Sequence, residues 1–148
     1  MNLYQNGLNI EKILCEIYQK YKTQNFGAIV HFIGVVRDEI SQNSKIDGLS
    51  FDIYEPLLQK WLNSWEDKAQ KNNAKILFFH SIGDVKIHES SFIAAVLSPK
   101  RKVALKLIND FVEDFKANAP IWKYDLINNK RFFAKDRSFK LKNSGILK

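Results

Sequence analysis

Two lysines bracket a proline in the segment FKANAPIWK, residues 115–123. A residue that precedes proline is driven out of the helical region, so we expect a helix to end near Asn118 and a strand to begin after Pro120. Lys116 then belongs to the last turn of the helix and Lys123 to the strand, which lets the two amines converge. A lysine amine that is partly removed from water can act as a proton donor or a nucleophile.

The spacing around each lysine also permits a purely structural role. Ile108, Val112 and Lys116 follow one another at four-residue steps, so the stem of Lys116 should lie on apolar surface with its amine reaching outward. A lysine in a last helical turn also pairs with the negative end of the helix dipole. Strand alternation puts Lys123 and Asp125 on one face, where they could simply form an ion pair. The local pattern therefore leaves both roles open.

Three further cations crowd the start of the same helix. Ser98 can cap this helix, and Pro99 suits its first position. The next three residues are Lys100, Arg101 and Lys102. The helix dipole is positive at this end, so each cation there is disfavoured by about 0.3–1 kcal/mol. Free backbone N–H groups together with Lys100 and Arg101 favour a phosphate or carboxylate site over a merely solvated turn.

Another candidate cation follows the most apolar stretch of the chain. Residues 26–36 form an almost unbroken run of β-branched and aromatic side chains, which predicts a strand buried on both faces at the centre of a sheet. Gly34 indicates a bend near its end, and Arg37 is the first charge after it, at the mouth of the sheet. Arg37 is either a ligand-binding group or an ordinary strand-end charge. We interpret His31, inside the run, as a core imidazole rather than a ligand.

Helices and strands alternate along the chain and predict a single domain. By their apolar spacing and their flanking signals, the expected helices cover residues 11–22, a segment that starts at Glu55-Pro56, and residues 98–118. The other expected strands are residues 47–54, 75–82, 91–97, the segment after Pro120, and 131–137. A polar loop at 38–46 could close over a ligand, and residues 83–90 join two strands.

Composition narrows the class of protein and of partner. The chain has 148 residues with 45% apolar side chains, and no apolar run reaches the roughly 18 residues of a membrane span. Its start has no secretory signal, so we expect a cytoplasmic protein. A lone Cys15 and three scattered histidines give no metal signature. Residues 1–98 carry 10 Lys/Arg against 11 Asp/Glu, and residues 99–148 carry 13 against 5. This basic last third favours an anionic partner or is a solvated surface.

Five segments in consistent order resemble one known family. They are GAIVHFIGVVR at 27–37, FDIYEPL at 51–57, HSIGDV at 80–85, SPKRKVAL at 98–105, and FKANAPIWK. Together they resemble the large, catalytic subunit of molybdopterin synthase, the MoaE family. The last segment is the most specific, because a lysine, a short spacer, Ala-Pro, an apolar residue and Trp-Lys occur together. The resemblance covers about residues 1–137.

The resemblance implies a fold, partners and a reaction. The fold would be α+β and α/β hammerhead-like, with a mixed, mainly antiparallel sheet packed with three main helices. The assembly would be a homodimer within a heterotetramer, each copy binding a small ubiquitin-like sulfur-carrier subunit. The carrier's C-terminal Gly-Gly thiocarboxylate would supply sulfur to cyclic pyranopterin monophosphate and form the molybdopterin dithiolene, with no metal or cofactor of the enzyme's own.

The resemblance also implies roles for individual residues. Lys116 matches the essential lysine, a general acid/base near the thiocarboxylate, and Lys123 matches a second functional lysine of the substrate pocket. Arg37 matches a pocket arginine, and Arg101 matches one contributed across the dimer interface. Lys100 stands where the family usually has histidine, so it would keep a positive charge for phosphate but could not serve as a neutral imidazole base.

Other readings stay open alongside this one. His88-Glu89 replaces a glycine that is frequent in the family's hairpin, which we interpret as a local change of turn. The chain could be a non-catalytic scaffold for a ubiquitin-like partner. It could also be a nucleic-acid-binding module built on its basic last third, although the cations lack interleaved aromatics. We expect residues 1–137 to form the domain and residues 138–148 a basic tail that is mobile or folds onto a partner.

Overall fold

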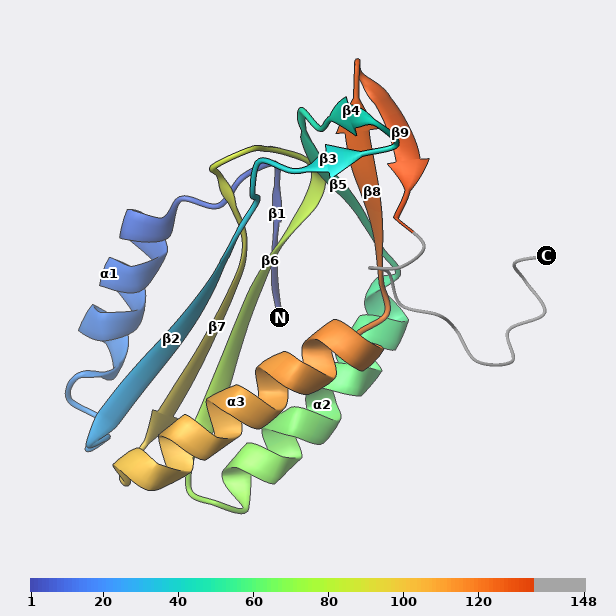
Figure 1. Cartoon of the computed structure of the whole chain (residues 1–148). Helices are drawn as coiled ribbons and strands as arrows, with labels where there is room; N and C mark the ends of the chain where they lie inside the picture. The colour runs from blue at the N-terminus through green and yellow to red at the C-terminus, as the bar shows by residue number, and fades with distance from the viewer. Residues whose placement is uncertain (135–148) are drawn as a thin grey trace.

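A mixed sheet with helices on both faces forms the body of the protein (Figure 1). The computed structural model describes residues 1–134. Its helices are α1 (Ile10–Tyr21), α2 (Glu55–Gln70) and α3 (Arg101–Asn118). Its strands are β1 (Asn2–Gln5), β2 (Ala28–Val35), β3 (Ile40–Ser41), β4 (Ser44–Lys45), β5 (Gly48–Ile53), β6 (Lys75–Lys86), β7 (Ser90–Ser98), β8 (Ile121–Ile127) and β9 (Lys130–Phe133).

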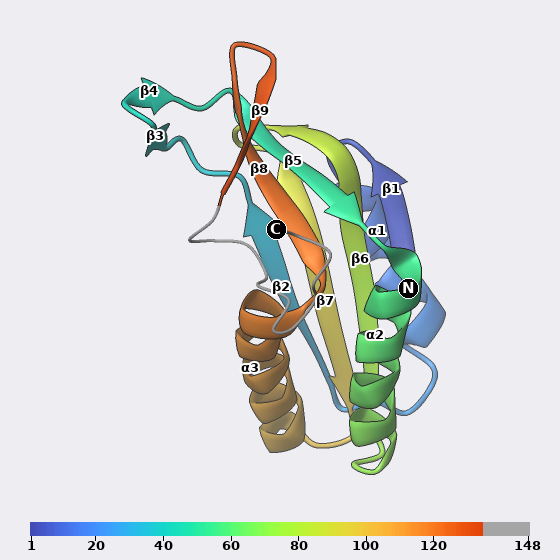
Figure 2. The same cartoon turned by 90° about the vertical axis from the view of Figure 1, so that its right-hand side faces the viewer.

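The strand pairing is antiparallel with one exception. Six strands follow the order β2-β7-β6-β5-β8-β9, and each of these pairings is antiparallel, whereas β1 pairs in parallel with β6. β3 and β4 form a separate hairpin, which lies near the β8–β9 hairpin at one end of the molecule (Figure 2). The predicted class, a mainly antiparallel mixed sheet with three helices, is confirmed.

The two faces of the sheet are buried against different helices. Every residue of β7 is buried, and its side chains alternate between two hydrophobic clusters. Ala94 and Val96 belong to the cluster that α2 and α3 complete. Ile93 and Ala95 pack with α1 on the opposite face. Helices on both faces of the sheet therefore explain why β7 is a long apolar run.

Local signals account for two of the predicted helix ends. The side chain of Asn9 accepts a hydrogen bond from the backbone N–H of Lys12, which caps α1 as expected. α3 ends at Asn118, and Ala119 is extended before Pro120, as the proline predicts. The other end of α3 differs from the prediction.

The predicted cap of α3 at Ser98 is wrong by two residues. Lys100 occupies the N-cap position without a side-chain hydrogen bond to the helix, and the helix begins at Arg101. Ser98 ends β7, and its hydroxyl instead accepts a hydrogen bond from the backbone N–H of Lys100 at 3.1 Å. The hydroxyl supports the turn between strand and helix rather than the first helical turn.

The predicted central position of residues 26–36 is also wrong, because β2 pairs only with β7 and is an edge strand of the described sheet. Its apolar side chains pack on both faces, with Ile29 and Ile33 toward α1 and Val30 toward the α2–α3 side. An apolar run reports which faces are covered but not which edges are paired. His31, expected in the core, is exposed.

Three connections differ from their predicted limits. β6 continues through residues 83–86, so the turn is confined to the residues before β7, where His88 has a positive φ of 68°. Glycine adopts a positive φ without steric cost, which explains why a glycine would suit this position. The predicted loop at 38–46 contains the β3–β4 hairpin. The predicted strand 131–137 is represented by β9, and residues 135–137 and the tail 138–148 lie outside the described residues.

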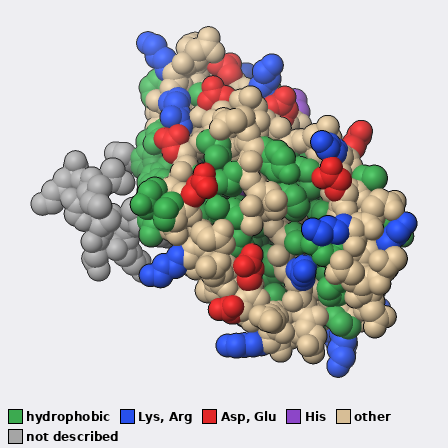
Figure 3. Space-filling model, turned by 180° about the vertical axis from the view of Figure 1, so that it is seen from behind, with side chains coloured by type: hydrophobic (Ala, Val, Ile, Leu, Met, Phe, Trp, Pro, Cys, Tyr) green, Lys and Arg blue, Asp and Glu red, His purple; other side chains and the backbone are tan. Residues whose placement is uncertain are grey.

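The surface mixes charge types and apolar groups. Seen from behind, lysines and arginines are interspersed with acidic side chains and with hydrophobic areas (Figure 3). Among residues 1–134, no helix is long and apolar enough to cross a membrane.

A half-buried carboxylate joins α2 to α3. Oδ2 of Asp114 accepts hydrogen bonds from the indole N–H of Trp61 at 2.9 Å and of Trp65 at 2.7 Å. Its Oδ1 accepts one from the side-chain amide of Asn118 at 2.6 Å. Burial raises the pKa of Asp114, but these hydrogen bonds and the charge of Lys68 outweigh burial and leave the pKa below its ordinary value.

We predict that Asp114→Ala lowers the free energy of unfolding by about 2–3 kcal/mol, because two indole N–H groups lose a charged acceptor. The folded-state pKa is depressed, so the carboxylate stabilises the fold above its unfolded pKa, near 4, and less as the pH falls below that value. Urea unfolding at pH 7 and pH 3 measures both effects. Glu113→Ala is the control, because Glu113 is an exposed neighbour on the same helix. An equal loss of unfolding free energy in both variants would show that the hydrogen bonds of Asp114 to the two tryptophans do not stabilise the fold.

Candidate active site

Three of the five predicted site residues line one cavity. Arg37, Lys116 and Lys123 border a space of about 390 Å³ where β2 ends, β7 begins and α3 passes into β8. Arg37 and Lys116 are exposed, and Lys123 is half-buried. The two lysines on either side of the break at Pro120 therefore border the same cavity.

The connection between α3 and β8 sets the position of both lysines. Lys116 lies in the last turn of α3, and Ala119 and Ile121 contribute to the cavity wall on either side of the proline. Lys123 lies opposite Phe51 in the β5–β8 register. A rigid helix end and a paired strand therefore hold the two amines on one opening, with only a few residues of chain between them.

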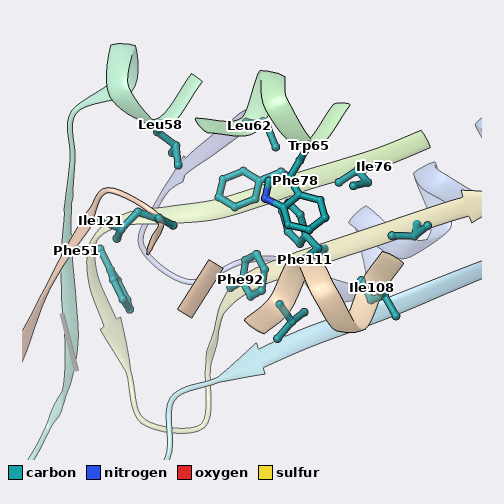
Figure 4. Close-up of a cluster of buried hydrophobic side chains, with 14 of the residues drawn as sticks. Phe51, Leu58, Leu62, Trp65, Ile76, Phe78, Phe92, Ile108, Phe111 and Ile121 are labelled. Carbon is teal, nitrogen blue, oxygen red and sulfur yellow. The ribbon is translucent and has the colours of Figure 1, made fainter. Parts of the chain in front are cut away.

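An aromatic wall faces the cations. Phe92 and Phe115 stack with ring centroids 4.1 Å apart and an interplanar angle of 8°, and both line the cavity. Phe51 and Ile121 extend this wall from β5 and β8 (Figure 4). A cavity that combines cations with flat apolar surface suits a ligand with an anionic group and a flat ring or an extended backbone.

Among residues 1–134, one acidic side chain borders the same opening. Glu39 borders the cavity, and its carboxylate accepts a hydrogen bond from the guanidinium of Arg37. The carbonyl of Glu39 accepts a hydrogen bond from the backbone N–H of Ile46 across the β3–β4 hairpin. The hydroxyl of Ser41 donates to Asp125 at 2.6 Å and ties this hairpin to β8. The carboxylate of Glu39, at the start of the hairpin, is therefore a negative charge beside the cations of the cavity.

Lys100 and Arg101 do not reach the cavity of their own chain. They lie at the start of α3, whereas Lys116 lies fifteen residues further along. At 1.5 Å per residue this separates Arg101 from Lys116 by about 22 Å. Within one chain, the cations at the start of α3 and the cations of the cavity are therefore two separate groups. The expected contribution of Arg101 across a dimer interface stays a prediction.

His80 is a cavity residue whose contribution the sequence alone did not reveal. It projects from β6, is 2% exposed, and lies among aromatic rings. Burial lowers the pKa of His80 to about 4, and the nearby charge of Lys123 acts in the same direction. The sequence does contain one signal for the burial of His80. Side chains alternate along β6, so His80 lies on the same face as Phe78, a core residue.

No group of three or more His, Cys, Asp or Glu side chains within residues 1–134 is arranged to hold a metal ion.

Comparison with known proteins identifies the family. The family model described as MoaE protein matches residues 6–118. The chain belongs to the MoaE family. It is 46% identical over 147 residues to a molybdopterin synthase catalytic subunit from Helicobacter pylori (strain ATCC 700392 / 26695), covering 99% of each chain.

Two solved structures are also similar to this chain. A protein-protein complex of subunits 1 and 2 of molybdopterin-converting factor from Helicobacter pylori 26695 contains a chain with a TM-score of 0.90 and 46% identity, covering 99% of this chain and 98% of that one. Molybdopterin synthase from Staphylococcus aureus has a TM-score of 0.74 at 24% identity, covering 89% and 94%, and supports the fold alone.

We predict that Glu39→Gln strengthens binding of inorganic phosphate to the cavity, because the variant removes a carboxylate that competes for Arg37. The side chain of Arg37 is 79% exposed, so the pair contributes about 1 kcal/mol at most, and the gain should be at most about fivefold. Titration followed by NMR measures the dissociation constant. Asp38→Asn is the matched control, because Asp38 pairs with Lys45 on the hairpin surface. Unchanged or weaker binding to Glu39→Gln would show that the carboxylate does not compete.

Proposed function

We propose that this chain is the catalytic subunit of a molybdopterin synthase. It would transfer sulfur from the C-terminal thiocarboxylate of a small ubiquitin-like carrier to cyclic pyranopterin monophosphate, forming the molybdopterin dithiolene. The observation that carries the proposal is the convergence of Arg37, Lys116 and Lys123 on one aromatic-walled cavity in a MoaE chain. The proposal includes a cytoplasmic location.

The chemistry needs groups that bind anions and move protons. The substrate carries a cyclic phosphate, and the carrier leaves the reaction as a carboxylate once water replaces its sulfur. Arg37 and Lys123 would hold these anionic groups, and donors fixed in advance stabilise charge that develops during the reaction. Lys116 would serve as the general acid/base next to the attacked carbon, since its amine lies at the cavity while its stem is anchored on α3.

The proposed assembly accounts for the two separated groups of cations. The Helicobacter pylori relative of known structure is described as a complex of two subunits, and by analogy a carrier would bind this chain with its terminal glycines in the cavity. Lys100 and Arg101 do not line their own cavity, and Arg101 lies about 22 Å along the helix from Lys116, so we assign them to a site in a second copy. In a homodimer within a heterotetramer, they would complete the partner's anion site. Lys100 would contribute charge there but no neutral imidazole.

We predict that Lys116→Ala folds normally and lowers dithiolene formation at least 100-fold, the usual contribution of a general acid/base. The assay combines purified thiocarboxylated carrier with cyclic pyranopterin monophosphate and measures the dithiolene product. Lys106→Ala is the control, because Lys106 lies on the same helix in an exposed pair with Asp110. Near-normal turnover by Lys116→Ala would refute the catalytic role of Lys116.

The same purified proteins separate the competing functions. A scaffold would bind the carrier yet leave the substrate unconverted in the wild-type chain. A nucleic-acid-binding module would bind random RNA or DNA at physiological salt, with affinity falling steeply as salt rises. The mixed charges on the face seen in Figure 3 favour the enzyme over the nucleic-acid module on that side of the molecule.

A further inference from the structure

His80 is held in one orientation at the base of the cavity. Its Nδ1 lies 2.8 Å from the carbonyl oxygen of Ser81. The ring of Phe78 stacks on it at 5.9 Å with an interplanar angle of 15°, and the edge contact with Phe51 is 4.9 Å between centroids. Phe115 lies 5.7 Å away on the α3 side. These contacts leave the imidazole little freedom to turn.

The hydrogen bond to Ser81 determines the tautomer. A carbonyl oxygen can only accept, so Nδ1 must carry the hydrogen and Nε2 must carry the lone pair in the neutral ring. Burial and the charge of Lys123 disfavour a second proton, so the ring stays neutral at pH 7. His80 therefore offers a hydrogen-bond acceptor rather than a cation.

The remaining nitrogen, Nε2, belongs to a side chain that lines the cavity. The backbone already occupies Nδ1. Nε2 is therefore the nitrogen of His80 left to meet a ligand in the cavity, even though the residue is only 2% exposed.

Among the described polar side chains of the cavity, Ser91 has a hydroxyl that can donate or accept, and the others are poorer acceptors. Arg37, Lys116 and Lys123 donate hydrogen bonds when charged and accept none. Glu39 accepts, but its carboxylate already pairs with Arg37 at the outer rim. A ligand that presents both an anionic group and an N–H group would meet cations for the first and His80 for the second.

We propose that His80 is a specificity-determining residue whose Nε2 accepts a hydrogen bond from an N–H group of the ligand that enters the cavity. This inference rests on the proposed function for the identity of that ligand. The N–H group belongs either to the ring of the pterin substrate or to the terminal amides of the carrier. A site built around a buried acceptor discriminates strongly against a ligand that lacks the matching donor.

The first experiment observes the imidazole directly by ¹⁵N NMR of wild-type protein. His80 should be the Nδ1–H tautomer and stay neutral from pH 8 down to about pH 5. Cyclic pyranopterin monophosphate and a synthetic peptide ending in a Gly-Gly carboxylate are then added separately. A shift of the Nε2 resonance with either probe supports the proposal. The probe that causes the shift identifies whether the pterin or the carrier supplies the N–H group. No shift with both probes, or an Nε2–H tautomer, overturns it.

The second experiment uses His80→Phe, which keeps an aromatic ring among its aromatic neighbours and removes the lone pair. The probe that shifts Nε2 should bind this variant at least tenfold more weakly, whereas inorganic phosphate should bind equally well because the cations are unchanged. Equal affinity for both would overturn the proposal. If His80→Phe does not fold, the wild-type NMR result decides alone. The NMR shift and the binding affinity do not depend on turnover. A wild-type chain without activity would therefore refute the proposed enzymatic function without deciding the role of His80.

Discussion

The connection from α3 through Pro120 to β8 is the constraint on which the site depends. The proline ends the helix at Asn118, and β8 pairs immediately with β5, so the chain turns at the edge of the core without a flexible linker. Phe111 and Val112 bury the preceding turns of α3 against the sheet. The position of Lys116 is thereby fixed by the hydrophobic core, and Lys123 by strand pairing.

The charge of the cavity is unbalanced without a ligand. In the described part of the chain three cations and one carboxylate border it, and the mutual repulsion of the cations is tolerated because two of them remain exposed to water. An anionic ligand would relieve that repulsion and exclude water, which strengthens every remaining electrostatic contact. Glu39 lessens the imbalance at the rim, and its place on the β3–β4 hairpin makes this loop part of the site.

The features that could be predicted from sequence are those governed by neighbours along the chain. The helix end at Asn118 followed from Pro120, the cap of α1 from Asn9, and the convergence of Lys116 and Lys123 from the short connection between their elements. The edge position of β2 depends on pairing with β7, some sixty residues later, and no local pattern encodes it. Alternation from Phe78 indicates a core-facing His80, but its place at the cavity depends on rings from β5, β7 and α3, which no local pattern encodes.

The two ends of α3 carry cations for different physical reasons. At its C-terminal end Lys116 interacts favourably with the helix dipole, so its position there costs the fold nothing. At the N-terminal end Lys100, Arg101 and Lys102 oppose the dipole, and no side chain caps the helix. Cations retained against this cost are most readily explained by a bound anion. Because the helix is about 27 Å long, an anion at this end would lie far from Lys116, and in the proposed homodimer it would belong to the site of the other copy.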